Sequence, residues 1–577
     1  MNKRIDKEFI KIVRLPQLLV ALMLSFTVFV FAPVNAYQLN RMNFDFTSNL
    51  FLIYLAIPFT AAAVVLLGIM TISMLAGRKA YIVTVSALFG IGVAFYIQGN
   101  FLCLSNSVLM GGEPEWTTLM RPALINLAVW FLITVVSIVF EITKARIFLK
   151  TALYASALLI VMEGGSLAVT GFLSQRIPET SQRAYSTVKD EFTVSENGDI
   201  IVFLLDAFDT RYMQMAMDAY PEWMGSFSDF TYYPNTSSTY QRTEPSYINM
   251  LTRTRYYNQE PFYTWVDIAL QDEPFFTVLR ENGYTLDFYA VPDNLFPLQM
   301  ADVAENVKKP EVQITHPYSF VYTLERMALY KFGPLVLQPF MYGDYAVLLQ
   351  RDYELTEMKS TWFEADALER MRKHGGYSLN GDSKYFKFYH FQGAHSPGNL
   401  DRYGNTIDDS SGTLDEQALG SLNIVGQYLQ ALKDCGAYDS SMIVIMGDHG
   451  RQDSVYEGNN TVCNPIFLTK YPGQRSVTGE ITVNEVSQVS LEDLAATCMD
   501  GAGLAYDADI FGKPARDWDG TERERIFYAY RHSFTTMNGD TYLEGMQEYK
   551  VPQDARDLHL YELTGKTIPD KQWIEGY

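Results

Sequence analysis

Long apolar runs dominate the first part of the chain. Five of them, near residues 16–36, 50–75, 81–102, 122–142 and 147–173, each reach the ~20 residues that a helix needs to cross a bilayer. Shorter polar stretches separate the runs. The pattern therefore predicts five transmembrane helices and a membrane domain over residues 1–175.

Shorter apolar runs follow in the second part. Ile200–Leu205 and Met442–Met446 have the length and composition of buried strands. Between them, a helical period begins at Thr413 with Glu416 three residues later, as in a capping box, and stops at Gly436. A helix leading into a strand indicates an α/β domain. We expect a polar linker over residues 176–194, a catalytic domain over 195–520 and extra strands over 521–577.

The distribution of charge predicts the orientation in the membrane. The N-terminus carries Lys3, Arg4, Lys7, Lys11 and Arg14. Alternate loops carry Arg78 with Lys79 and Lys144 with Arg146, and the loops between them are poorer in cations. Because Lys and Arg are retained on the cytoplasmic side, the N-terminus is expected inside and residues 176–577 outside. A cleaved signal peptide is the alternative for the first run, but four further runs follow it.

The two parts also differ in net charge. Residues 1–175 have a net charge of +5, and the remaining residues have a net charge of −26. Together they give the total of −21. An acidic outer domain argues against nucleic acid as a partner. It is equally the composition of an ordinary solvated surface.

Polar side chains follow the two predicted strands. Asp206 comes directly after the first strand, and Asp448-His449 come after the second and its Gly447. Open α/β sheets place their sites at this end of their strands. Thr243, in the run TEPSYINMLT, supplies a hydroxyl at a predicted helix start. Two carboxylates, one imidazole and one hydroxyl suit one divalent cation, Mn²⁺, Mg²⁺ or Zn²⁺, without selecting among them.

Each of these residues also has a structural reading. Asp206 is compatible with a polar strand end, Thr243 with a helix N-cap, and Asp448-His449 between glycines with a turn. His390, in the run YHFQGAHSP, fits a packed, hydrogen-bonded strand residue. The order of the whole set along the chain is what favours a site.

That order, Asp206, Thr243, His395 and Asp448-His449, resembles the alkaline phosphatase superfamily, and within it the sulfatase-like branch. The resemblance covers roughly residues 195–505. It implies an α/β domain with a central, mostly parallel mixed sheet flanked by helices. Sulfatases carry Cys or Ser as the nucleophile in a segment similar to the one that holds Thr243.

The chain departs from the sulfatase pattern at informative positions. Threonine cannot become the formylglycine of sulfatases, which points to phosphoryl chemistry. Ala207 replaces their second Asp, and Tyr247 replaces their Arg. The Lys and His of their pocket have no counterpart around Phe288–Val291. The chain looks more like the membrane-anchored lipoteichoic acid synthases and phosphoethanolamine transferases, which also have five spans, although these commonly have Glu in place of Asp206.

The resemblance implies a reaction and its residues. Thr243 would be the nucleophile, and Asp206, Thr243, Asp448 and His449 would hold the metal. His395 would hold a phosphate oxygen or protonate the leaving group, with His390 as a second substrate contact. The donor would be a membrane phospholipid, and the acceptor a cell-surface glycan or glycolipid. A phosphodiesterase or phosphatase that uses water is one alternative, and a catalytically inactive membrane scaffold is the other.

Overall fold

The computed structural model divides the protein into two compact units. One comprises Met1–Ser181 with Pro310–Thr356, and the other Gln182–Lys309 with Glu357–Tyr577. We name them after the two predicted domains: the membrane unit and the catalytic unit. The structure describes residues 7–40, 44, 46, 48–102, 116–174, 183–292, 295–343, 345–381, 383–407, 412–450, 464–530, 535–537, 540–543 and 545–569. The rest of the chain, including most of the first half of the predicted linker, lies outside this description.

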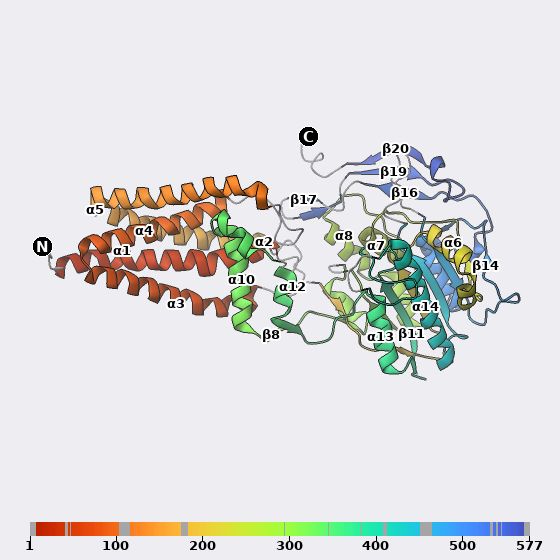
Figure 1. Cartoon of the computed structure of the whole chain (residues 1–577). Coiled ribbons are helices and arrows are strands. Elements are labelled where there is room, and N and C mark those ends of the chain that lie inside the picture. The colour runs from red at the N-terminus through yellow and green to blue at the C-terminus, as the bar shows by residue number, and fades with distance from the viewer. Residues whose placement is uncertain are drawn as a thin grey trace. The chain divides into compact units, whose positions relative to one another are not determined.

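Five stretches of the membrane unit are long and apolar enough to cross a bilayer, as predicted (Figure 1). They are Ile12–Asn40, Leu50–Leu75, Arg78–Leu102, Leu119–Lys144 and Ile147–Gly171. The helices are α1 (Lys7–Phe26), the π-helix η1 (Thr27–Phe31), α2 (Ala32–Asn40), α3 (Ser48–Leu75), α4 (Arg78–Ile97), the π-helix η3 (Gln98–Leu102) and α5 (Trp116–Ser174). The last two spans share α5, which is broken at Lys144 by a non-helical φ of −139°.

A segment from the middle of the chain folds with the membrane unit. Residues 310–356 interrupt the sequence of the catalytic unit and pack with the spanning helices. The segment contains β8 (Val312–Ile314), α10 (Pro317–Phe332), η7 (Leu335–Leu337), α11 (Gln338–Met341), α12 (Tyr345–Gln350) and β9 (Tyr353–Leu355). The sequence analysis did not predict that this segment folds with the spanning helices.

A seven-stranded sheet forms the centre of the catalytic unit. Its spatial order is β14 (Thr482–Val483), β4 (Thr231–Tyr232), β13 (Phe467–Lys470), β12 (Met442–Gly447), β3 (Ile200–Leu205), β11 (Lys384–Phe391) and β6 (Tyr284–Tyr289). Four of the six neighbouring pairs are parallel. The other two pairs, on either side of β13, are antiparallel. The predicted mostly parallel mixed sheet after five spans is therefore confirmed.

Both faces of the sheet are covered by helices, which explains the continuous apolar runs of its central strands. Ile200, Val202 and Leu204 of β3 join one core, and the alternate side chains join the other. The first core also contains side chains of α7 (Thr243–Thr252), α8 (Phe262–Leu270), α9 (Pro274–Glu281) and α15 (Leu494–Gly501). The second contains side chains of α6 (Thr210–Ala219), α13 (Glu364–His374) and α14 (Leu414–Cys435).

Helix α14 matches the predicted helix at both ends. Thr413 Oγ1 accepts a hydrogen bond from Glu416 N at 3.2 Å, and Gly436 ends the helix with φ 91°. The carboxylate of Glu416 accepts from Arg402. Beyond residue 520, β16 (Ile526–Ala529), β19 (Met546–Lys550) and β20 (Glu562–Ile568) form a separate three-stranded antiparallel sheet.

Candidate metal and nucleophile site

The register of the central strands brings Asp206, Asp448 and His449 together. Gly447 of β12 lies opposite Leu205 of β3 in a parallel pair, so the next residue of each strand reaches the same edge. One ligand atom from each of the three side chains lies within 4.8 Å of the others. His449 Nε2 is 3.6 Å from Asp206 Oδ1 and 3.5 Å from Asp448 Oδ2.

Thr243 brings its hydroxyl to the same point. Thr243 Oγ1 is 3.4 Å from Asp206 Oδ2 and 3.4 Å from His449 Nε2. Thr243 is the first residue of α7, and Arg242 occupies the N-cap position without a side-chain cap. Thr243 is therefore inside the helix and not its N-cap. The positive end of the helix dipole lies beside the threonine oxygen and favours negative charge there.

Hydrogen bonds to the backbone orient Asp448 and His449. Asp448 Oδ1 accepts from the amides of Ala207 and His449, both at 2.9 Å. The ring Nδ1 of His449 donates to the Gly450 carbonyl at 2.8 Å, which leaves Nε2 with its lone pair toward the carboxylates. These contacts leave Asp448 Oδ2 and His449 Nε2 directed toward the same point.

The residues fit a divalent cation. Asp206 Oδ1 and Asp448 Oδ2 are buried and have no hydrogen-bond partner among the described residues. Two buried carboxylates this close repel each other and lose hydration, and a cation offsets both costs. Accordingly, burial and the charge of Asp206 raise the pKa of Asp448. Burial also raises the pKa of Asp206, but the imidazoles of His390 and His449 outweigh it and lower that pKa overall.

His390 lies behind the carboxylate of Asp206. It belongs to β11, is 2 % exposed, and places Nε2 3.5 Å from Asp206 Oδ2. Its ring centroid is 5.9 Å from that of Tyr247. The interaction of His390 with the Asp206 carboxylate contributes to lowering the pKa of Asp206, and the packed position on β11 is compatible with the structural reading. Its role as a substrate contact stays a prediction.

His395 lies in the loop after β11 and is partly exposed. Its Nδ1 donates to the Ser396 carbonyl at 2.6 Å, and its ring centroid lies 5.1 Å from that of Trp362. The charge of His395 also contributes to lowering the pKa of Asp206. The loop thus holds a third imidazole, after those of His449 and His390, within electrostatic range of Asp206.

The His395 loop rests directly on the backbone of Asp206. The Asp206 amide donates to the Phe391 carbonyl at 3.0 Å, and Ala394 N donates to the Asp206 carbonyl at 2.8 Å. Gly393 has φ 63°, and a Cβ there would lie 2.5 Å from Asp206 backbone atoms. Only glycine fits this crossing.

A buried glutamate, which the sequence did not point out, anchors that loop. Glu364 begins α13 and accepts hydrogen bonds from the amides of Gln392 and Gly393, both at 3.2 Å. Burial raises the pKa of Glu364 to about 7. Glu364 therefore positions the segment between the candidate metal ligand Asp206 and His395 through the backbone of that segment.

Three more side chains near Thr243 escaped the sequence analysis. The Glu244 carboxyl has its pKa raised by burial and by the charge of Asp206, and Arg242 partly opposes this. Tyr530, from the segment after β16, has a buried hydroxyl without a hydrogen-bond partner among the described residues. Burial and the charge of Glu244 raise the pKa of Tyr530. No spacing pattern links residue 530 to residue 243, so only the fold reveals this proximity.

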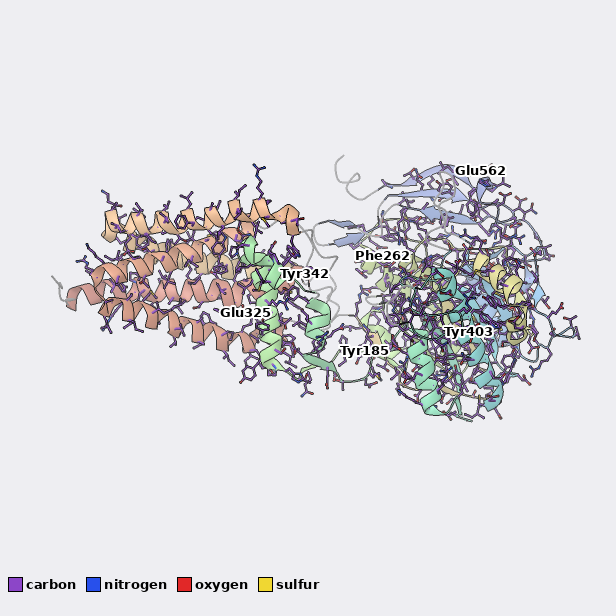
Figure 2. The ribbon with its side chains drawn as sticks, viewed as in Figure 1. Tyr185, Phe262, Glu325, Tyr342, Tyr403 and Glu562 are labelled. Atoms are coloured by element: carbon purple, nitrogen blue, oxygen red, sulfur yellow. The ribbon has the colours of Figure 1, made fainter. Side chains whose placement is uncertain are left out.

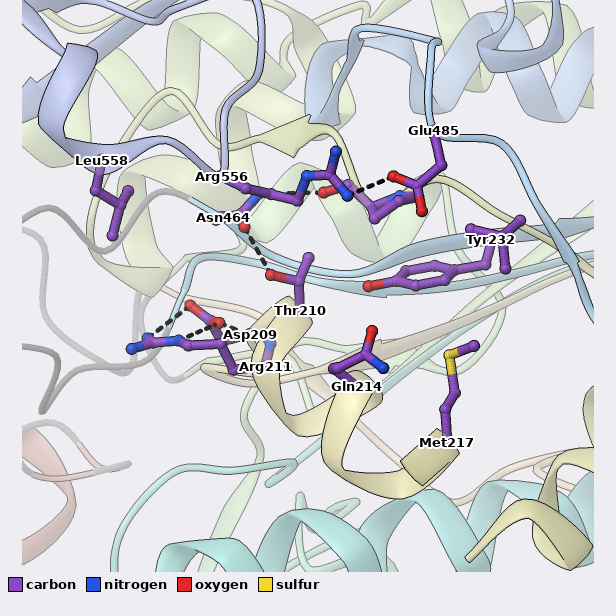
Figure 3. A pocket seen from close by; sticks show the side chains of 12 residues that line it. Asp209, Thr210, Arg211, Gln214, Met217, Tyr232, Asn464, Glu485, Arg556 and Leu558 are labelled. Carbon is purple, nitrogen blue, oxygen red and sulfur yellow. Dashed lines mark hydrogen bonds and ion pairs between the residues drawn. The ribbon is translucent and has the colours of Figure 1, made fainter. Parts of the chain in front are cut away.

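A separate pocket of about 310 Å³ is lined in part by Asp209, Thr210 and Arg211, which come shortly after Asp206 in the sequence (Figure 3). Its charged side chains are paired with each other or with neighbours: Asp209 with Arg211 at 2.8 Å, and Arg556 with Glu485 and Asp554. Thr210 Oγ1 donates to Asn464 Oδ1 at 2.6 Å. None of the predicted site residues lines this pocket.

Comparison with known proteins found structural matches only. No protein-family model matches the sequence, and no curated protein matches it. Among solved structures, the lipoteichoic acid synthase LtaP from Listeria monocytogenes matches with 15 % identity and a TM-score of 0.35, over 65 % of this chain and 86 % of that one. The phosphonate monoester hydrolase SpPMH from Silicibacter pomeroyi matches with 16 % identity and a TM-score of 0.32, over 59 % and 79 %. The putative sulfatase yidJ from Bacteroides fragilis matches with 12 % identity and a TM-score of 0.33, over 62 % and 87 %.

Proposed function

We propose that this protein is a membrane-anchored, metal-dependent phosphotransferase. It moves the phosphorylated head group of a membrane phospholipid, phosphoglycerol or phosphoethanolamine, through a covalent intermediate on Thr243. The acceptor is a cell-surface glycan or glycolipid. The catalytic unit lies outside the membrane, as the cation pattern of the loops predicts.

One observation carries the proposal. The Thr243 hydroxyl lies 3.4 Å both from an Asp206 carboxylate oxygen and from His449 Nε2, at the N-terminus of a ten-residue helix. A free threonine hydroxyl is a poor nucleophile at neutral pH. A divalent cation held by Asp206, Asp448, His449 and Thr243 would stabilise the negative charge that develops during attack.

The chain's own residues account for the first half-reaction. Thr243 Oγ1 attacks the phosphorus of the donor, and its proton passes to Asp206 Oδ2, the neighbouring acceptor. The bond between phosphorus and the diacylglycerol oxygen breaks as that oxygen takes a proton from His395. The products are diacylglycerol and a phosphodiester on Thr243.

The second half-reaction reverses these roles. An acceptor hydroxyl loses its proton to His395 and attacks the same phosphorus. The bond to Thr243 Oγ1 breaks, and that oxygen takes its proton back from Asp206 Oδ2. Phosphorus, charge and protons balance over the cycle, and the enzyme returns to its starting state.

Two features support a lipid phosphoester as the substrate. Five spans are more than anchoring needs, since one helix holds a domain at a bilayer. A threonine at this position excludes the formylglycine route to sulfate esters.

The test is head-group release by the full-length protein from labelled phosphatidylglycerol or phosphatidylethanolamine. Wild type should produce diacylglycerol, faster when a glycan acceptor is added, and Thr243→Ala should produce none. Thr252→Ala, which alters the far end of the same helix, is the matched control. Rapid release to water without acceptor dependence would make the protein a hydrolase. Failure of the wild type to turn over either lipid with any of the three metals would support the inactive scaffold.

A further inference from the structure

Residues 310–356 attach to one end of the five-helix bundle. Three hydrogen bonds form the centre of this attachment. Leu335 N donates to Asn126 Oδ1 at 3.0 Å, and Asn126 Nδ2 donates to Gln98 Oε1 at 2.6 Å. Trp130 Nε1 donates to the same Gln98 oxygen at 3.1 Å. Asn126 and Gln98 are buried, so the backbone amide of Leu335 completes a polar network inside the membrane unit.

Aromatic packing reinforces this attachment. The ring centroid of Phe332 lies 5.5 Å from that of Phe31. A Cβ on Gly99 would lie 1.9 Å from the Phe332 ring, so the absence of a side chain at Gly99 makes room for it. Near the beginning of α10, Phe320 packs against Phe46 with ring centroids 5.0 Å apart. The segment is built into the bundle and does not merely lie on it.

These contacts fix the level of the segment in the bilayer. Phe31 lies nine residues before the end of the span Ile12–Asn40, roughly 13 Å of helix at 1.5 Å per residue. Gly99 and Asn126 likewise lie within spans, Arg78–Leu102 and Leu119–Lys144. The end of α10 and η7 therefore lie level with the terminal turns of these candidate spans, at the boundary between hydrocarbon and headgroups. Non-helical backbone in contact with the hydrocarbon is tolerated only when it is buried in protein, as the Asn126 contact to Leu335 provides.

Helix α10 crosses the direction of the spanning helices, and thus runs along the plane of the membrane (Figure 1). Its outward face is aromatic: Tyr318 is 85 % exposed and Tyr322, one turn later, is 67 % exposed. Phe340 of α11 is 71 % exposed. Figure 2 marks this segment by Glu325 on α10 and by Tyr342 just after α11. Exposed Tyr and Phe on a helix in the interface plane are the side chains that bury in a headgroup layer.

We propose that residues 317–341 are an interfacial membrane element whose partner is the phospholipid headgroup layer. Tyr318, Tyr322 and Phe340 lie in that layer. Because the chain enters this segment from the catalytic unit at residue 310 and returns to that unit after residue 356, the segment links the catalytic unit to the membrane independently of the connection through residue 181. The inference stands whether or not the proposed reaction is correct.

A cleavage experiment on the full chain tests the independent attachment. A protease site inserted between residues 178 and 179 is cut after folding and purification in lipid nanodiscs. The fragment that begins after the cut should remain with the N-terminally tagged helices through exchange into fresh buffer. Phe332→Ala and Asn126→Leu combined with Tyr318→Ala, Tyr322→Ala and Phe340→Ala should release it, whereas Tyr403→Ala, an exposed aromatic of the catalytic unit, should not. Release of the wild-type fragment, or full retention of the combined variant, would overturn the attachment.

A depth measurement tests the lipid contact and does not depend on variants that disturb folding. Spin labels on Tyr318→Cys, Tyr322→Cys and Tyr403→Cys, in a chain whose native cysteines are replaced by alanine, are compared in nanodiscs. Labels at 318 and 322 should be more accessible to oxygen and less accessible to a water-soluble nickel reagent than the label at 403. Equal aqueous accessibility at all three sites would contradict the lipid contact. Strong immobilisation with protection from both reagents would indicate a protein partner instead and would equally refute it.

Discussion

Replacing Glu364 by glutamine should change how the stability of the catalytic unit depends on pH. Glu364 is fully buried, and its carboxyl receives the amides of Gln392 and Gly393. Its pKa is raised by burial from 4.5 to about 7. Between pH 4.5 and about pH 7, Glu364 is therefore protonated in the folded state, whereas in the unfolded state it has released its proton.

The sign and size follow from proton linkage. The stability that protonated Glu364 contributes is complete below pH 4.5 and is lost as pH rises through about 7. A shift of this size corresponds to roughly 3 kcal/mol in the free energy of unfolding. Glu364→Gln resembles the protonated acid and cannot titrate, so this loss disappears. For a unit of roughly 350 residues, the difference between variant and wild type should grow by roughly 4 °C in melting temperature from pH 4.5 to pH 8.

Thermal unfolding of the full-length protein in detergent, followed by tryptophan fluorescence, measures this difference. Glu562→Gln, at an exposed position of β20, is the control and should track the wild type at every pH. A constant gap between Glu364→Gln and wild type from pH 4.5 to pH 8 would refute the reasoning. It would mean that Glu364 is ionised in the folded protein throughout, and that its two amide contacts outweigh burial.

The remaining predictions concern the metal, His395 and the topology. Saturating Mn²⁺, Mg²⁺ or Zn²⁺ should stabilise the wild type by about 3 kcal/mol at a hundredfold excess over Kd, and Asp448→Asn should abolish this shift. Asp434→Asn, an exposed position of α14, should keep it. His395→Gln should lower kcat by about 10²–10⁴-fold while the metal-induced melting shift is unchanged. Loss of that shift would instead make His395 part of the metal site. Reporter fusions at Arg78 and Lys144 should read cytoplasmic and one at Gly198 external, and a cytoplasmic reading at Gly198 would contradict the orientation.

The sequence predicts the elements whose pattern is local. Ile200–Leu205 forms a strand with the expected bounds, because a six-residue apolar run between polar residues has few other solutions. The convergence of Asp206 with Asp448 and His449 follows from the same reading, since parallel strands end at one edge of the sheet. Thr243 was expected near this edge only through the resemblance.

Other features depend on contacts that no local pattern encodes. Glu364 is 28 residues from Gln392 and looks like an ordinary acidic residue at a helix start. Tyr530 reaches the neighbourhood of Thr243 because β16 pairs its Tyr528 with Tyr240. The segment 310–356 packs with the membrane unit through the match between Phe332 and Gly99 and through one amide to Asn126. Apolar residues in such a segment look the same in sequence whether they pack on a sheet or on a helix bundle.

The central claim is that Thr243 carries the transferred group. The direct measurement is the mass of the peptide containing Thr243, after the metal-loaded full-length protein has been incubated with phosphatidylglycerol or phosphatidylethanolamine and quenched in acid without acceptor. Phosphoglycerol or phosphoethanolamine should be found on Thr243, should disappear when acceptor is added before the quench, and should be absent from Thr243→Ala. An unmodified Thr243 in protein that is releasing diacylglycerol, or equal release by Thr243→Ala, would contradict the account.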